Sequence, residues 1–162
     1  MAALDGRVQL LFNGEIYNYL ELRAELKARG HRFRSESDGE VLLASYLEWG
    51  TSCVSHFRGM WAFAIWDRDE RSLFCSVDRS GIKPFYYRRD GCALTFASEP
   101  KAFHAAGLRL VPNLAAVRDY VAYAIVDHGP ETFFADVHRL PAAHSLVFDR
   151  RGLTVTRYWE LP

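Results

Sequence analysis

Long apolar runs are missing from this 162-residue sequence, and so is an excess of charge of either sign. No run approaches the ~18 apolar residues of a membrane-spanning helix, and the first six residues have neither the basic nor the apolar region of a signal peptide. The 20 basic residues balance the 20 acidic ones and form no basic stripe of the kind that nucleic-acid-binding proteins carry. We therefore expect neither a membrane nor a nucleic-acid partner.

Cysteine is scarce, and its spacing does not indicate a metal site. The three cysteines, Cys53, Cys75 and Cys92, include no C-x-x-C pair, and the six histidines show no H-x-x-x-H or mixed Cys/His spacing. Because Cys75 lies in an apolar run and Cys92 beside one, we expect buried small hydrophobic side chains rather than reactive thiols. An odd number of cysteines without a pairing pattern favours a reducing compartment, and hence a cytoplasmic location.

Common catalytic signatures are also absent: the sequence has no G-x-S-x-G, no Walker loop and no G-x-G-x-x-G. What is present is 49% hydrophobic and 14% aromatic residues at zero net charge, which excludes a disordered chain. A chain of this length can bury ~70% of its extended surface. We therefore expect a single folded domain over residues 1–162.

Short apolar and periodic segments predict the elements of the fold. A buried strand over Val8–Phe12 ends at Asn13-Gly14, and a helix from Tyr19 to Leu26 has Asn18 as its N-cap and Gly30 as its stop. The remaining predicted elements are a helix around Val41–Trp49, hairpins of Met60–Trp66 with Ser72–Val77 and of Pro84–Arg89 with Cys92–Ala97, helices over Pro100–Ala106 and Leu114–Ile125, and a closing hairpin of Ser145–Phe148 with Leu153–Tyr158. This order indicates an α+β fold with antiparallel sheets.

Asn13-Gly14-Glu15 follows the first predicted strand and has two interpretations. An Asn-Gly pair beside an apolar run is a strong signal for a hairpin turn, although the next segment leads into a helix rather than a partner strand. Alternatively, the side-chain amide of Asn13 and the backbone N–H of Gly14 form an oxyanion hole, because glycine lets the backbone approach a substrate closely. The residues alone leave both interpretations open.

The segment from Ser35 to Glu40 also has two interpretations, which are compatible with each other. Ser37 and Glu40 fit the capping box of a helix start, and Asp38 suits the positive end of the helix dipole. The Asp38 carboxylate is equally suited to bind a substrate ammonium group, since a helix N-terminus at a strand end often borders a site.

Several longer motifs resemble those of class II glutamine amidotransferases of the asparagine synthetase type, and they occur in the order of that family. They are Phe12–Asn18, Ser37–Val41, Phe57–Ala64, Asp78–Tyr87, Phe96–Ala102 and a tail from Leu140-Pro141 to Tyr158-Trp159. Together they cover nearly the whole chain. The resemblance is therefore specific.

The resemblance implies an N-terminal-nucleophile hydrolase fold, an αββα sandwich of two mostly antiparallel sheets with flanking helices. It implies hydrolysis of glutamine to glutamate and ammonia, which passes to a synthetase domain that activates aspartate or a related carboxylate with ATP. On this basis Asn13 and Gly14 form the oxyanion hole, Asp38 holds the α-ammonium of glutamine, and Glu15 lines the same pocket.

Asp78, Arg79 and Lys83 match a further motif of the family. For these residues we expect a role in shaping the loop, with a buried Asp–Arg pair, rather than a chemical role.

Other parts of the family pattern are missing, so the sandwich is expected to be partial. The family's nucleophile is a cysteine at the mature N-terminus, whose α-amino group serves as base, whereas this chain begins Met1-Ala2-Ala3. The Arg-Leu-Ser motif that binds the glutamine carboxylate and the ATP-binding Ser-Gly-Gly-Leu-Asp-Ser loop are missing too. We therefore predict an N-terminally incomplete glutaminase domain without its synthetase domain, inactive alone, with glutamine binding weak or lost.

Two functions stay open: part of an asparagine synthetase-like enzyme, or a non-catalytic binding or scaffold module that retains the fold. No cofactor is expected in this chain, because ATP and Mg²⁺ belong to the synthetase domain. Missing strands would leave an unpaired sheet edge. We therefore expect a partner over that edge, either the synthetase domain or a second chain, which includes a homodimer.

Overall fold

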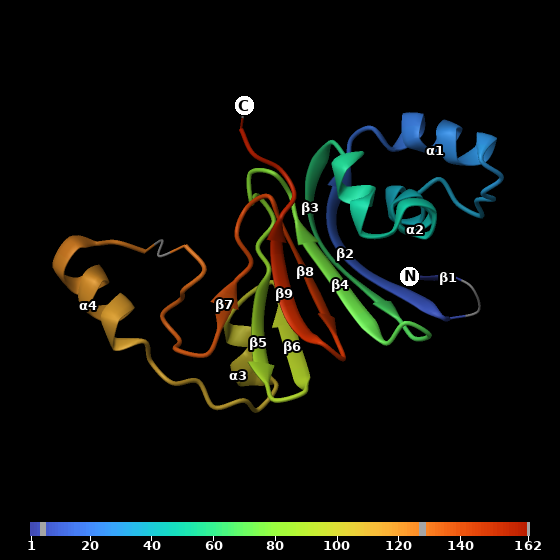
Figure 1. The fold of residues 1–162 in the computed structure, drawn as a ribbon. Helices are drawn as coiled ribbons and strands as arrows, with labels where there is room; N and C mark the ends of the chain where they lie inside the picture. Colours follow the sequence, from blue (N-terminus) through green and yellow to red (C-terminus); the bar gives the residue numbers. More distant parts are fainter. Residues whose placement is uncertain (4–5, 127–128, 162) are drawn as a thin grey trace. The chain divides into compact units, whose positions relative to one another are not determined.

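The computed structural model describes residues 1–3, 6–126 and 129–161. The chain forms two compact units, which we call the first unit (Met1–Lys83 with Ala142–Pro162) and the second unit (Pro84–Pro141). Figure 1 labels the helices and strands of both units.

The first unit is built on a six-stranded sheet in the order β1-β2-β3-β4-β8-β9, in which every neighbouring pair is antiparallel. The strands are β1 (Ala2–Ala3), β2 (Val8–Ile16), β3 (Gly59–Asp67), β4 (Ser72–Val77), β8 (His144–Asp149) and β9 (Gly152–Arg157), and the helices are α1 (Tyr19–Ala28), α2 (Asp38–Trp49) and the 3₁₀-helix η1 (Gly50–Ser55). The predicted hairpins β3–β4 and β8–β9 are confirmed. β1 and η1 are not predicted, because elements this short leave no periodic pattern.

One face of this sheet forms the core together with α1 and α2. Side chains alternate along β2, so that Val8, Leu10 and Ile16 are buried whereas Leu11 and Asn13 are exposed. The buried residues of β2 join apolar residues of α1, α2 and β3 in one cluster. Both helices lie on the same side of β2 and β3 in Figure 1.

The Asn13-Gly14 pair lies inside β2, so the hairpin-turn interpretation is wrong. Gly14 pairs with Trp61 and Ile16 with Gly59, and this pairing with β3 carries β2 beyond the predicted end at Phe12. β2 continues past Phe12 because β3 continues to pair with it, and the sequence around Asn13 does not reveal this pairing.

Asn18 is the N-cap residue of α1, as predicted, but its side chain does not cap the helix. Its Nδ2 instead donates to His56 O at 3.0 Å, and its Oδ1 accepts from Arg58 N at 2.8 Å. Asn18 therefore fastens the start of α1 to the segment that precedes β3.

The second unit contains a three-stranded sheet in the order β6-β5-β7, also antiparallel. Its elements are β5 (Tyr86–Asp90), β6 (Ala93–Ala97), α3 (Lys101–Ala105), α4 (Leu114–Tyr123) and β7 (His138–Arg139). The predicted β5–β6 hairpin is confirmed, and Gly91 supplies the positive φ of its turn at +56°. α4 ends two residues before the predicted Ile125, because Ala124 adopts the left-handed conformation.

The helices of the described residues are short. The longest, α2, has 12 residues, whereas a membrane span needs ~20. Within the described ranges no helix combines the length and the apolar character that crossing a bilayer requires.

Candidate functional site

Gly14 occupies a position in β2 where no side chain fits. Its φ is +155°, and a Cβ atom added there would lie 2.2 Å from Met60 O and 2.7 Å from the Cα of Trp61. Gly59 on the facing strand is equally constrained, because its Cβ would lie 2.1 Å from Glu15 O. The two glycines allow β2 and β3 to approach closely at this end of the sheet.

The N–H group of Gly14 points to the outer edge of β2, away from β3. Tyr17 N–H donates to Arg58 O at 2.7 Å on the β3 side, whereas Leu10 N–H donates to Met1 O at 2.8 Å on the other side. Since successive residues of a strand direct their amides to alternate sides, Gly14 N–H shares the side of Leu10. β1 pairs with only the first two residues of β2, so no described strand covers the edge beside Gly14.

Asp38, the first residue of α2, lies at the same edge. Ile16 N–H donates to its Oδ2 at 3.0 Å, and Ile16 directs its N–H to the same side as Gly14. The carboxylate is partly buried, and no described residue donates a hydrogen bond to its second oxygen, Oδ1. One oxygen therefore fixes the carboxylate to β2 while the other is available to a ligand.

Hydrogen bonds from the preceding segment hold the start of α2 in place. Ser37 Oγ accepts from Glu40 N at 3.3 Å, as a capping box requires. The Glu40 carboxylate reaches further back than the capping box predicts, to Arg34 N at 2.7 Å and Ser35 N at 2.8 Å. Burial acts to raise the pKa of the Glu40 carboxyl, but these amide bonds and one from the Ser35 hydroxyl outweigh it and leave the pKa below its ordinary value.

The spacing along this edge suits a short ligand with an amide at one end and an ammonium group at the other. One strand residue, Glu15, lies between Gly14 and Ile16, so two strand rises place the Gly14 amide about 7 Å from the amide that binds Asp38. In glutamine, five bonds join the α-nitrogen to the side-chain carbonyl oxygen, an extended span of about 6 Å.

Asn13 and Glu15 are exposed and alternate with the buried residues of β2. Their side chains therefore leave the sheet on the face opposite to α2, whereas Asp38 reaches the edge from the helix side. The structure thus brings Gly14 and Asp38 together at the outer edge of β2. The side chains of Asn13 and Glu15 approach that edge only from the face of the sheet opposite to α2.

The model of the glutamine amidotransferase domain family matches residues 1–159. The chain belongs to this family. It is 41% identical over 158 residues to asparagine synthetase [glutamine-hydrolyzing] 3 of Bacillus subtilis, a match that covers 94% of this chain and 25% of that protein. It is 39% identical over 158 residues to putative asparagine synthetase [glutamine-hydrolyzing] 2 of Methanocaldococcus jannaschii. This match covers 94% of this chain and 30% of that protein. The chain thus spans about a quarter to a third of the length of these relatives.

Solved structures with the same fold include glutamine phosphoribosylpyrophosphate amidotransferase from B. subtilis. The TM-score is 0.70 at 19% identity, over 99% of this chain and 31% of that chain. A glutamine aminotransferase class-II domain protein from Silicibacter pomeroyi matches with a TM-score of 0.56 at 15% identity, over 96% of this chain and 69% of that chain. These matches confirm the predicted α+β class with mostly antiparallel sheets and flanking helices.

The two cysteines of the first unit, Cys53 and Cys75, lie in η1 and β4 and not at the edge of β2. Cys53 and Cys75 are fully buried, and burial raises the pKa of the Cys53 thiol to about 12 and that of Cys75 further still. Cys92 is exposed, so its predicted burial is wrong: it lies in the β5–β6 turn, where no element covers it. The thiolate is the nucleophilic form of cysteine, so the two buried thiols are poor nucleophiles.

We expect one thiol per chain to react quickly with Ellman's reagent in the native domain. Cys92 is accessible, whereas Cys53 and Cys75 must wait for unfolding because they are buried and protonated. Absorbance at 412 nm reports the count, and guanidinium should release the other two. Substitution Cys92→Ser should leave no fast-reacting thiol, and a fast second thiol would contradict the described burial.

Asp78 organises the loop after β4 through backbone amides and not through the predicted pair with Arg79. Its carboxylate, only 1% exposed, accepts hydrogen bonds from Trp61, Ser80, Ile82 and Lys83 N–H at 3.0–3.1 Å. The predicted role in shaping the loop thus holds, by a different set of contacts.

Arg79 turns away from Asp78. Its Nη2 donates to Phe57 O at 3.3 Å, and its guanidinium lies over the Trp159 ring, 5.5 Å from the ring centroid. Both contacts join distant segments of the first unit, so the side chain acts in packing.

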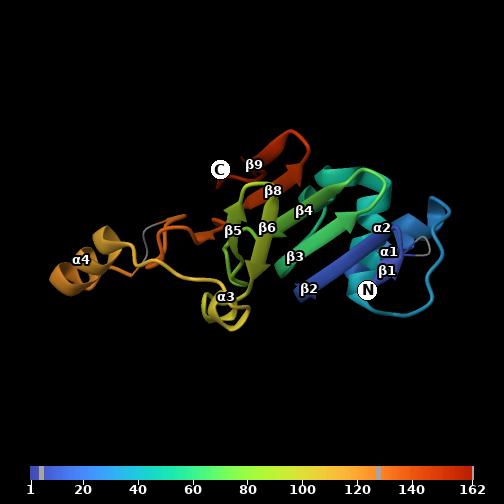
Figure 2. The ribbon, with the colours of Figure 1, turned by 90° about the horizontal axis from the view of Figure 1, so that it is seen from below.

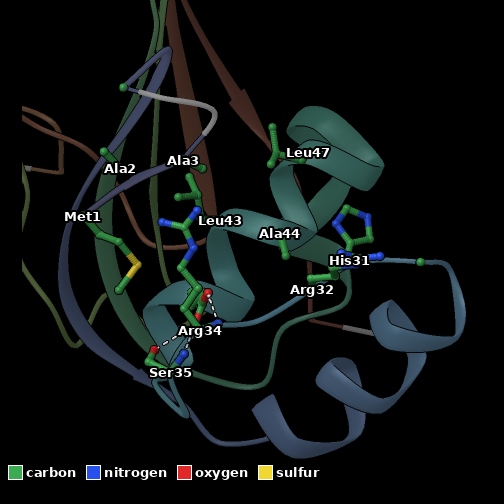
Figure 3. A pocket seen from close by; sticks show the side chains of 13 residues that line it. Met1, Ala2, Ala3, His31, Arg32, Arg34, Ser35, Leu43, Ala44 and Leu47 are labelled. Atoms are coloured by element: carbon green, nitrogen blue, oxygen red, sulfur yellow. Dashed lines mark hydrogen bonds between the residues drawn. The ribbon is translucent and has the colours of Figure 1, made fainter.

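A cavity of about 710 Å³ lies elsewhere in the first unit, between β1, the α1–α2 loop and α2 (Figure 3). Its lining includes His31, Arg32 and Arg34 but neither Gly14 nor Asp38. The sequence does not signal this cavity, because residues from three separate segments form it. The described residues also bring no three His, Cys, Asp or Glu side chains together as a metal site would need.

Proposed function

We propose that this domain binds the side-chain amide and the α-ammonium of glutamine at the outer edge of β2, as part of an asparagine synthetase-like system. The observation that carries the proposal is that the Gly14 amide and the Asp38 carboxylate share one edge at about the span of glutamine. In such a system, the amide nitrogen leaves as ammonia and amidates aspartate or a related carboxylate at the expense of ATP. The relatives named as glutamine-hydrolysing asparagine synthetases support this assignment.

The amide end of glutamine lies at Asn13 and Gly14 in this proposal. Attack on the amide carbonyl places negative charge on its oxygen, and two N–H donors aimed at that oxygen stabilise it. Gly14 N–H is held in place by a strand that tolerates no side chain at this position. Asn13 Nδ2 supplies the second donor from the exposed face of β2, with Glu15 two residues further along that face.

The ammonium end lies at Asp38. A carboxylate that is already fixed by Ile16 N–H keeps its second oxygen in a defined position, so little side-chain entropy is lost when the ammonium group binds. The charge-assisted hydrogen bond that results contributes about 1.5–3 kcal/mol to binding.

The 162 residues supply donors and a carboxylate but no suitable cysteine nucleophile, because Cys53 and Cys75 are buried and none of the three cysteines carries a free α-amino group beside its thiol. We therefore expect this chain by itself to bind glutamine weakly and to release no ammonia. ATP and Mg²⁺ serve the amidation step and have no role at the β2 edge.

Titration of the ¹⁵N-labelled chain with L-glutamine tests the proposal. We expect the amide resonances of Gly14 and Ile16 to shift together with a dissociation constant of about 1 mM. Asp38→Asn should weaken binding about tenfold, since the carboxamide oxygen can still accept from Ile16 N–H while the charge is lost. A coupled glutamate dehydrogenase assay on the same sample should detect no ammonia above the buffer.

Glu36→Gln is the matched control, because Glu36 is an exposed acid two residues before Asp38. It should bind glutamine as the unmodified chain does. Equal weakening by both substitutions would indicate a general charge effect, and shifts confined to other residues would place glutamine elsewhere. Suppose that the full-length protein binds glutamine but neither releases ammonia nor amidates a carboxylate. That result would favour the non-catalytic module instead.

A further inference from the structure

The cavity of Figure 3 is separate from the proposed glutamine site, and three segments of the first unit form its walls. Its volume of about 710 Å³ lies within the range of small-molecule sites, roughly 300–1,000 Å³. β1 lies beside α2 in both Figure 1 and Figure 2, and the loop between α1 and α2 completes the lining. The cavity therefore belongs to one compact unit.

The charged side chains of the lining leave an excess of positive charge. Two arginines, Arg32 and Arg34, face one acid, Glu40. The Glu40 carboxylate already accepts hydrogen bonds from two backbone amides and from the Ser35 hydroxyl. The remaining titratable side chain, His31, bonds to a carboxylate outside the lining. The two guanidinium groups are therefore the charges that a ligand can use.

Arg32 and Arg34 differ from other arginines of the first unit. Arg7, Arg29 and Arg79 each make at least one hydrogen bond through the guanidinium group. Within the described ranges, neither Arg32 nor Arg34 makes a hydrogen bond or an ion pair through its guanidinium group. Both side chains are exposed, so their donors are hydrated and can be transferred from water to a ligand.

Phe33, which lies between the two arginines in the sequence, anchors their backbone. Its ring packs against the core of the first unit, and the Arg23 guanidinium lies 5.0 Å from the ring centroid. One residue further, Arg34 N–H donates to the Glu40 carboxylate at 2.7 Å. The arginines line the cavity whereas Phe33 does not, so the anchored segment presents its charges to the cavity and its apolar ring to the core.

The floor of the cavity is apolar. Leu43, Ala44 and Leu47 of α2 line it together, because residues three and four apart share a helix face. Leu43 and Ala44 belong to the core, and Leu47 is half-buried against it. In Figure 3 the Arg34 side chain extends toward Leu43, and Leu47 lies about 6 Å further along the helix axis. A ligand with its charge at Arg34 would thus place its body over this floor.

We propose that this cavity binds a small organic anion, a carboxylate with an apolar body of about five or six carbon atoms, which span about 6 Å. The planar guanidinium group of Arg34 matches a carboxylate through two parallel N–H···O bonds, and Arg32 adds a second positive charge. The floor formed by α2 contacts the apolar body. The proposal does not rest on the glutamine site.

Titration of the ¹⁵N-labelled 162-residue chain with hexanoate at low ionic strength tests the proposal. We expect the amide resonances of Arg34, Ser35 and Leu47 to shift together, with a dissociation constant of about 1 mM. Acetate, inorganic phosphate and 1-hexanol should each bind at least about tenfold more weakly, since each lacks either the apolar body or the charge. Arg34→Gln should weaken hexanoate binding about tenfold and leave the urea midpoint unchanged, because the guanidinium makes no bond within the structure.

Arg150→Gln serves as the comparison, because Arg150 is an exposed arginine of the first unit outside the lining. It should bind hexanoate as the unmodified chain does. Arg34→Lys should retain part of the affinity, since it keeps the charge but loses the planar fork. Asp38→Asn should leave hexanoate binding unchanged, which separates this proposal from the one for glutamine. The absence of shifts at the cavity, phosphate binding as tight as hexanoate binding, or equal weakening by Arg34→Gln and Arg150→Gln would overturn the proposal.

Discussion

Gly14→Ala should destabilise the first unit by about 4 kcal/mol or more. The added Cβ would lie 2.2 Å from Met60 O and 2.7 Å from the Cα of Trp61, so it meets backbone atoms that no side-chain rotation can move. Relief requires that β2 separate from β3, and this would break the ladder that runs from Val8 to Ile16. We expect the substituted chain to be largely unfolded at 25 °C.

Urea denaturation followed by tryptophan fluorescence measures this effect, and Gly30→Ala provides the control. Gly30 also has a positive φ, +99°, but a Cβ there would meet nothing within 4 Å. Its substitution carries only the left-handed backbone cost of about 1–2 kcal/mol. If the two variants lost equal stability, the close approach of the two strands at Gly14 would be refuted.

Asp78→Ala should cost about 3–5 kcal/mol of unfolding free energy. The substitution leaves four backbone N–H groups without their acceptor, and one of them, Trp61 N–H, is buried in the strand beside β4. Each unsatisfied buried donor costs about 1–3 kcal/mol, and water can reach only some of them. The loop that joins Val77 to Lys83 should lose its order as well.

Asp149→Ala is a suitable comparison for Asp78. The Asp149 carboxylate also accepts a hydrogen bond from a loop amide, Arg151 N–H at 2.7 Å, but this bond is exposed to solvent. Its loss should cost less than about 1 kcal/mol in the same urea titration. A similarly small loss for Asp78→Ala would mean that the loop does not depend on the carboxylate.

The secondary structure could largely be predicted because most of its signals are local. Gly91 requires a turn between β5 and β6, and Ser37 accepts from Glu40 N as a helix cap does. The errors occur where a segment that is distant in sequence decides the local conformation or the hydrogen-bond partner. Asn13-Gly14 has the local features of a turn but is held extended by β3, and Asn18 uses its side chain for a segment about 40 residues away.

The candidate site could be predicted only in part. The motifs around Asn13 and Asp38 single out these residues, but nothing in their spacing reveals that Asp38 binds Ile16 N–H or that Asn13 leaves the sheet on the other face. The predicted pair of Asp78 and Arg79 shows the same limitation. Adjacent opposite charges suggest an ion pair. The Asp78 carboxylate instead accepts hydrogen bonds from backbone amides that the folded loop brings around it.

The order of the motifs along the chain by itself predicted the family, and the family match over residues 1–159 confirms that prediction. Glycine at position 14 belongs to one of these motifs, and the tertiary structure supplies the reason for it, which is the close approach of β3. Only the folded chain decided which edge of β2 is uncovered, which donors point there and how far Asp38 lies from them. These properties depend on the register between strands and helices that are distant in sequence, and that register is set by the packing of the whole core.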